Sequence, residues 1–108
     1  MKIMLSMQNG ITAHELARMC RGVLQNEDNS NLKINALCTD SREADERTAF
    51  FALAGERVNG HDYIPAAVAQ GCRCIISQEP IECGEDVAVI AVKDSEMALS
   101  YMASARLE

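Results

Sequence analysis

The sequence predicts a single α/β domain in which helices flank a small, partly parallel sheet. Residues 48–54 and 87–92 are continuous apolar runs bounded by turn residues, a pattern typical of strands buried on both faces of a parallel sheet. Residues 48–77 also have the order strand, helix, strand, over about the length of a βαβ crossover. Together, these patterns indicate that at least part of the sheet is parallel.

The first helix is predicted to start at Thr12. The Thr12 hydroxyl can accept a hydrogen bond from the first turn, and Glu15, three residues later, completes a capping box. Ile11 and Leu16 are spaced for a hydrophobic staple. Gly22 is a natural end for this helix.

A short strand at residues 23–25 and a loop of turn-forming residues at 26–31 follow. Between Leu32 and Thr39 every second residue is apolar, which indicates a strand with one buried face. This strand delivers Asp40–Arg42 at its carboxyl end, just before the buried strand that begins at Thr48.

The next helix is predicted over residues 63–70. Asp62 can cap it, Pro65 falls in its first turn, where a missing N–H does no harm, and Gly71 ends it. A strand over residues 72–77, a loop and the apolar strand 87–92 follow, before a terminal helix that Asp94 or Ser95 can cap. The apolar side of the terminal helix is expected to carry Met97, Ala98, Tyr101, Met102 and Ala105.

The terminal helix stops in mid-pattern at Glu108, without a capping residue. We therefore expect the native chain to continue beyond this point. We assign residues 1–106 to one domain and treat Leu107 and Glu108 as candidates for vector-derived residues, outside any functional argument.

Composition narrows the classes of partner. The net charge of −6, with no run of Lys or Arg, argues against nucleic acid or an anionic membrane surface. No apolar run approaches the roughly 18 residues that span a bilayer, and residues 1–10 lack the apolar segment of a secretory signal. We expect a cytoplasmic protein with no membrane partner.

The cysteine pattern favours free thiols. Five cysteines in a leaderless chain suggest a reducing compartment, and the odd count disfavours a complete disulfide framework. A zinc site from three of them with His14 or His61 is conceivable, but the chain has no C-x-x-C pair. We expect no metal and interpret the cysteines as small buried hydrophobic residues. They are Cys20, Cys38, Cys72, Cys74 and Cys83.

The motif Asp40–Ser41–Arg42 allows two interpretations. No histidine stands at a spacing suited to a base for Ser41, so a serine nucleophile is disfavoured. In the structural interpretation, Asp40 and Ser41 bond to local backbone and Arg42 pairs with a nearby carboxylate. In the binding interpretation, the Ser41 hydroxyl meets a heterocycle or ribose and Arg42 faces a phosphate.

Gly55 and Gly60 bracket the loop between the buried strand and the following helix. The loop is either a plain crossover or a segment whose glycines let backbone groups approach a ligand. It is not a G-x-x-x-x-G-K-[ST] phosphate loop, because His61 and Asp62 follow Gly60. We interpret His61 as a structural residue that orients the loop.

Taken together, these motifs resemble the amino-terminal domain of the Mur ligases, which add amino acids to the cell-wall precursor UDP-N-acetylmuramoyl peptide. The matching segments are Asp40–Arg42, Phe51–Gly55, Asn59–Ile64 and Gly71–Cys72, and the resemblance covers nearly the whole chain. The chain departs from the family pattern in having Asn59 for Asp, Cys72 for Ala, and no Gly-containing turn before the buried strand. Residues 55–57 and 92–95 are most similar to the members that add D-alanyl-D-alanine.

The resemblance implies that the chain binds the UDP end of UDP-N-acetylmuramoyl peptide. In the family, the residue before the Asp-Ser-Arg motif, its Ser and the three residues after the Gly contact the uridine portion. The substrate-binding residues implied here are Thr39, Ser41, Arg42, Gly55, Glu56, Arg57 and Val58, with Asn59, Gly60 and His61 supporting the loop.

The resemblance also implies a bacterial parent ligase of peptidoglycan biosynthesis that forms an amide bond with ATP and Mg²⁺. We expect no catalytic residue and no cofactor in this fragment, and the central and carboxyl-terminal domains of the ligase as its partners. Two alternatives stay open, the same domain of the tripeptide-forming ligase and an interaction domain without nucleotide function. A Gly-rich Lys-Thr/Ser loop soon downstream in the gene would favour a ligase, and a stop codon there would favour the interaction domain.

Overall fold

The computed structural model describes residues 4–55 and 59–106 and confirms the predicted α/β class. Its strands form one sheet of six, in the order β1-β3-β4-β5-β6-β2. The strands are β1 (Met4–Thr12), β2 (Val23–Leu24), β3 (Lys33–Cys38), β4 (Thr48–Phe51), β5 (Cys74–Ser77) and β6 (Ala88–Ala91). The α-helices are α1 (Ala13–Met19), α2 (Ile64–Ala69) and α3 (Ser95–Arg106), and the 3₁₀ turns are η1 (Glu27–Asn29), η2 (Ser41–Glu43) and η3 (Gly60–Tyr63).

The sheet is parallel at its centre and antiparallel at its edges. Strands β3, β4, β5 and β6 run parallel, whereas β1 pairs antiparallel with β3 and β2 antiparallel with β6. The predicted βαβ crossover is present as β4-α2-β5. Because the carboxyl ends of parallel strands meet at one edge, the loops that follow β3 and β4 are brought together.

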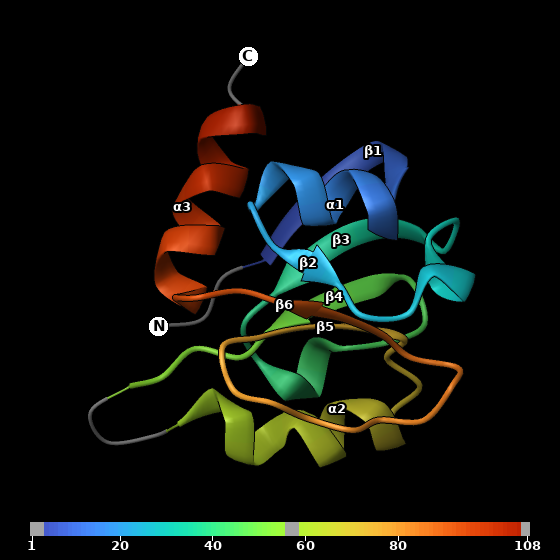
Figure 1. Ribbon diagram of the computed structural model, residues 1–108, viewed down its shortest axis with the longest axis vertical. Helices are drawn as coiled ribbons and strands as arrows, with labels where there is room; N and C mark the ends of the chain where they lie inside the picture. The colour runs from blue at the N-terminus through green and yellow to red at the C-terminus, as the bar shows by residue number, and fades with distance from the viewer. Residues whose placement is uncertain (1–3, 56–58, 107–108) are drawn as a thin grey trace.

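Two hydrophobic clusters cover the two faces of the sheet. Helices α1 and α3 pack on one face and α2 on the other, as Figure 1 shows. The neighbouring residues Phe50 and Phe51 on β4 point to opposite clusters, and all four residues of β4 are buried. The prediction that this strand is buried on both faces is confirmed.

The two short helices end in the same way. At the start of α1, Thr12 and Glu15 form the predicted capping box. At its end, Arg21 is in the left-handed region and the N–H of Gly22 donates to Ala17 O at 2.8 Å, as in a Schellman motif. Gly22 therefore serves close packing, since a Cβ there would lie 2.6 Å from Ile90 Cγ2. At the end of α2 the left-handed residue is Gly71, as predicted.

The capping residue of the segment before α2 differs from the prediction. Asn59, and not Asp62, accepts the N–H of His61 at 3.0 Å and starts the 3₁₀ turn η3. Helix α2 then begins at Ile64 with no side-chain cap and with Pro65 in its first turn. In α3 the cap is Asp94, whose Oδ1 accepts the N–H groups of Glu96 and Met97 at 2.9 and 3.2 Å.

Two predictions about strands were incomplete or wrong. Strand β1 was not predicted, and it bears an irregularity between Ser6 and Ile11. Strand β3 is not buried on one face alone, because Leu37 is as buried as Cys38. Asn35 and Ala36 both donate to Arg47 O, at 2.8 and 3.3 Å, as in a β-bulge, which shifts the alternation of side chains.

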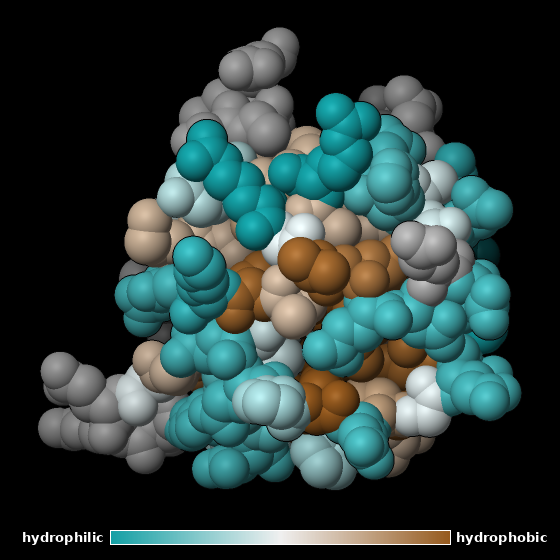
Figure 2. Space-filling model, in the orientation of Figure 1, coloured by the Kyte–Doolittle hydropathy of each residue, from teal (hydrophilic) through white to brown (hydrophobic). Residues whose placement is uncertain are grey.

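On the surface, one predicted core residue is exposed. Met97 of α3 is 51% exposed, so it does not belong to the apolar side of that helix. Figure 2 shows apolar surface near the centre of the face drawn in Figure 1, bordered by polar side chains. None of the helices in residues 4–55 and 59–106 has the length and apolar character needed to cross a membrane.

Candidate functional site

A hollow of about 740 Å³ opens at the carboxyl ends of β3 and β4. It brings together five of the predicted site residues from two loops that are distant in the sequence. These are Thr39, Ser41, Arg42, Gly55 and Gly60. Glu56, Arg57 and Val58 lie outside the described residues, between two residues that line the hollow. The remaining lining residues are Asp40, Phe50, Leu53, Ala54, Tyr63 and Glu96.

The Asp40–Arg42 turn has the local pairing that the structural interpretation predicted. Asp40 Oδ1 accepts a hydrogen bond from the backbone N–H of Arg42 at 2.9 Å. The same carboxylate accepts hydrogen bonds from Arg42 Nε at 3.0 Å and from Arg42 Nη2 at 2.7 Å. This two-bond ion pair raises the pKa of the exposed Arg42 guanidinium further above its ordinary value. The charge of Arg42 is therefore largely engaged by its own neighbour.

Hydrogen bonds to its backbone carbonyl hold Ser41 in place. The residue is buried, and its carbonyl accepts the N–H of Ala44 and the Nε2 of Gln70 at the end of α2. Gln70 Nε2 also donates to Ala44 O at 3.2 Å. These bonds fix η2 against α2, so Ser41 is presented to the hollow from a rigid turn.

The opposite wall is a tight backbone contact. Gly60 N–H donates to Leu53 O at 2.6 Å, and Ala54 and Asn59 form an antiparallel bridge. A Cβ at Gly60 would lie 2.7 Å from Leu53 N, so only glycine fits this contact. The two ends of the loop, at Ala54 and Asn59, are thus held together beside β4.

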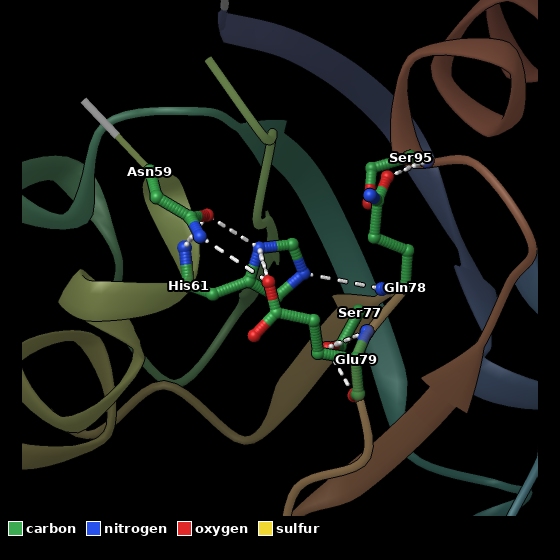
Figure 3. Close-up of polar contacts among 6 residues, drawn as sticks. All are labelled: Asn59, His61, Ser77, Gln78, Glu79 and Ser95. Atoms are coloured by element: carbon green, nitrogen blue, oxygen red, sulfur yellow. Dashed lines mark hydrogen bonds and ion pairs between the residues drawn. The ribbon is translucent and has the colours of Figure 1, made fainter. Parts of the chain in front are cut away.

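A buried histidine ties this wall to the next strand. His61 Nδ1 lies 2.7 Å from Asn59 Oδ1, and His61 Nε2 accepts the N–H of Gln78 at 3.2 Å, as Figure 3 shows. An Nε2 that accepts requires the neutral ring with its proton on Nδ1, which then donates to Asn59. Glu79 Oε2 lies 3.5 Å from His61 Nδ1 and accepts Asn59 Nδ2 at 3.2 Å.

Six lining residues were not among the predicted site residues, and two of them, Tyr63 and Glu96, lie on segments that had not been assigned to the site. Tyr63 is the last residue of η3 and is 45% exposed, although the pattern assigned it to the start of a helix. Glu96 comes from the start of α3, which follows β6 and therefore lies at the same edge of the sheet as the carboxyl ends of β3 and β4. The position of Tyr63 just after the predicted loop of Gly55 and Gly60 was the one local signal; nothing near Glu96 in the sequence points to the hollow.

The comparison with known proteins identifies the family. Residues 33–107 match the model described as "Mur ligase family, catalytic domain". The chain belongs to the Mur ligase family. The expected resemblance is thereby confirmed at the level of the family.

Individual Mur ligases match in sequence. Over 75 residues the chain is 36% identical to the UDP-N-acetylmuramoyl-tripeptide--D-alanyl-D-alanine ligase of Synechocystis sp., covering 68% of this chain and 16% of that protein. In a match that is also 75 residues long, it is 40% identical to the UDP-N-acetylmuramoyl-L-alanyl-D-glutamate--2,6-diaminopimelate ligase of Geobacillus kaustophilus, covering 69% of this chain and 15% of that protein.

A solved structure matches as well. The structure of UDP-N-acetylmuramoylalanyl-D-glutamyl-2,6-diaminopimelate--D-alanyl-D-alanyl ligase from Acinetobacter baumannii superposes with a TM-score of 0.81 at 32% identity. It covers 90% of this chain and 21% of that one. This Mur ligase chain therefore spans about a fifth or less of the length of the relatives it matches.

Four of the five cysteines of this Mur ligase chain are buried thiols. Burial raises the pKa of Cys20 to about 11 and that of Cys38 to about 12, and it also raises the pKa of Cys72 and Cys74. Cys83 is only half-buried, beside a second, apolar hollow of about 600 Å³ along α2. Among the described residues, no group of three or more His, Cys, Asp and Glu side chains could hold a metal ion.

We predict that iodoacetamide modifies Cys83 first in the folded chain. Burial also raises the pKa of Cys83, but its thiol is the only one of the five that is partly exposed. Burial should protect the other four cysteines at pH 8, and denaturant should expose them. Mass spectrometry of peptides after timed alkylation measures this order. Modification of Cys20 or Cys38 at the rate of Cys83 in the native protein would show that the core is open.

Proposed function

We propose that the chain is the module of a peptidoglycan ligase that binds UDP-N-acetylmuramoyl peptide through its UDP end. The hollow carries this proposal, because it unites Thr39, Ser41 and Arg42 with Gly55 and Gly60 at the carboxyl ends of parallel strands, where open α/β sheets bind ligands. The names of the relatives fit the same class of substrate. The domain that we assign to this role is residues 1–106.

In this proposal the buried Ser41 hydroxyl and nearby backbone groups read the uracil edges. The loop residues Glu56–Val58, between Gly55 and Gly60, complete the contact with the nucleotide. Because Arg42 is engaged by Asp40 at 2.7 Å, we assign the diphosphate to Arg57 in preference to Arg42. Asn59, Gly60 and His61 keep the base of the loop in place through their contacts with Leu53, Gln78 and Glu79.

The parent protein would be a cytoplasmic ligase that forms an amide bond at the expense of ATP. We place ATP, Mg²⁺ and the catalytic groups of that reaction in central and carboxyl-terminal domains outside these residues. The sequence supports this division, since it has no G-x-x-x-x-G-K-[ST] loop with which to hold a nucleotide triphosphate. The fragment alone would bind substrate without turning it over.

The amino acid that the parent adds has two candidates. D-Alanyl-D-alanine is favoured by a 31% identical ligase of Bacillus subtilis and by the Acinetobacter structure, which both match 90% of the chain. Diaminopimelate is favoured by shorter matches of higher identity, such as 39% over 77 residues in Bacteroides fragilis. Assaying the complete ligase with each amino compound decides between them, because only the true acceptor yields phosphate release.

We predict that Ser41→Ala lowers the affinity for UDP-N-acetylmuramoyl tripeptide by roughly two- to tenfold. This is the range expected for the loss of one neutral hydrogen bond of about 0.5–1.5 kcal/mol. Calorimetric or NMR titration of the chain measures it. Ser77→Ala is the matched control, since Ser77 is also buried but bonds to Glu79 away from the hollow. Equal affinity of Ser41→Ala and wild type would remove Ser41 from the site.

A further inference from the structure

Glu96 extends the hollow in a way that the family motifs do not indicate. It lies on the first turn of α3, is exposed, and lines the hollow together with Ser41 and Gly60. No motif of the proposed nucleotide site includes it. It is therefore a candidate contact of its own.

The position of Glu96 is fixed by its neighbours. Its N–H donates to Asp94 Oδ1 at 2.9 Å, and the preceding residue, Ser95, is fully buried and donates its N–H to Gln78 Oε1 at 2.9 Å. Gln78 is the residue whose own N–H meets the ring of His61 at 3.2 Å. The Glu96 and Gly60 sides of the hollow are thus both anchored on Gln78, as Figure 3 shows for Gln78, His61 and Ser95.

The charges around the hollow restrict which part of a nucleotide can face Glu96. The carboxylate of Asp40 and the guanidinium of Arg42 are paired with each other at 2.7 Å, which leaves the carboxylate of Glu96 as an additional negative charge among the described lining residues. A diphosphate beside it would suffer like-charge repulsion. The part of the ligand that faces Glu96 must therefore be neutral and must donate hydrogen bonds.

The ribose of a nucleotide meets that requirement better than its base. Two vicinal hydroxyls offer two donors to the two oxygens of one carboxylate, and acidic residues bind ribose hydroxyls in this way in dinucleotide sites. Uracil offers one N–H, which stands between two carbonyl oxygens that would repel a carboxylate. The chemistry thus favours the sugar as the neighbour of Glu96.

We infer that Glu96 is a specificity-determining residue that binds the ribose hydroxyls of the nucleotide in this hollow. It selects a ribonucleotide over a deoxyribonucleotide, and its charge keeps the diphosphate away from the start of α3. The inference rests on the proposed function, because it names a further contact within the same site.

The test compares two probes, UDP and 2′-deoxy-UDP, on the whole 108-residue chain. Both are titrated at millimolar concentration into wild type, Glu96→Ala and Glu85→Ala, with binding followed by NMR. Glu85 is an exposed acid on the connection between β5 and β6, outside the hollow, so its replacement removes the same charge without the contact. Thermal unfolding of the three proteins checks that all of them are folded.

Wild type and Glu85→Ala should prefer UDP by about tenfold, as expected for one hydrogen bond to a charged group, and Glu96→Ala should lose this preference to within about twofold. If Glu96→Ala keeps the preference, or binds UDP more tightly than wild type does, the inference is overturned. Equal binding of both probes to wild type also overturns it while leaving the proposed function intact. Failure of wild type to bind UDP at all contradicts the proposed function itself.

Discussion

Gly60→Ala should abolish measurable nucleotide binding and destabilise the fold by about 3 kcal/mol, the upper range for overpacking. The added methyl group would lie 2.7 Å from Leu53 N and 2.9 Å from Leu53 O. Both atoms belong to the backbone, so no side chain can rotate away, and the hydrogen bond from Gly60 N to Leu53 O must lengthen. Urea unfolding measures the free-energy change, and titration with UDP measures binding.

Gly84→Ala is the control for this experiment. Gly84 has a φ of +90°, but a Cβ there would meet no atom within 4 Å. Its replacement should cost about 1 kcal/mol through backbone strain alone and leave binding unchanged. If Gly60→Ala is no more damaging than Gly84→Ala, then the contact between Gly60 and Leu53 does not shape the hollow.

Phe51→Ala should cost about 3–5 kcal/mol of folding free energy, as expected for an aromatic residue removed from a close-packed core. Phe51 is 0% exposed and belongs to the cluster that Leu16 of α1 and Met102 of α3 share with the sheet. A domain of this size has a total stability of only about 5–15 kcal/mol. The loss is a large fraction of that total, so the midpoint temperature of thermal unfolding should be much lower in the variant. Circular dichroism during heating measures the loss.

Phe51→Leu is the matched variant, since a branched apolar side chain refills much of the space and should cost less than about 1.5 kcal/mol. Phe50→Ala provides a second comparison. Phe50 is equally buried on the same strand but also lines the hollow, so its replacement should affect both stability and binding. Equal stability of Phe51→Ala and wild type would contradict the assignment of β4 to the centre of the core.

The buried strands could be predicted from the sequence because the burial of each is visible locally. The runs at 49–54 and 87–92 are apolar at every position, and a strand between two helical layers needs that pattern. The capping box of Thr12 and Glu15 was also predicted correctly, since both partners lie within one helical turn. Features that depend on a few adjacent residues were therefore accessible.

Features that depend on contacts between distant residues could not be predicted from the sequence. Asn59 and Asp62 are both suitable caps before the same helix, and Asn59 is chosen because its side chain also meets His61 and Glu79. Leu37 and Cys38 are both buried because β3 is covered on both faces, with Leu37 in one hydrophobic cluster and Cys38 in the other. Strand β1 stands at an edge and carries no continuous apolar run, which is why its pattern gave no signal.

The candidate site was also predicted only in part from the sequence. Thr39, Ser41, Arg42, Gly55 and Gly60 were assigned to one site by resemblance, and they line one hollow in the structure. The sequence did not indicate Glu96, because α3 reaches the hollow only through the order of the strands. Its role in binding is a consequence of the tertiary fold.

The most direct test of the nucleotide-binding hollow is chemical-shift mapping of the ¹⁵N-labelled chain during titration with UDP-N-acetylmuramoyl tripeptide. The account predicts that the largest shifts occur at the amides of Thr39, Ser41, Gly60 and Tyr63, which line the hollow at the carboxyl ends of β3 and β4. Shifts concentrated instead at Val68 and Cys83, beside the apolar hollow along α2, would contradict it.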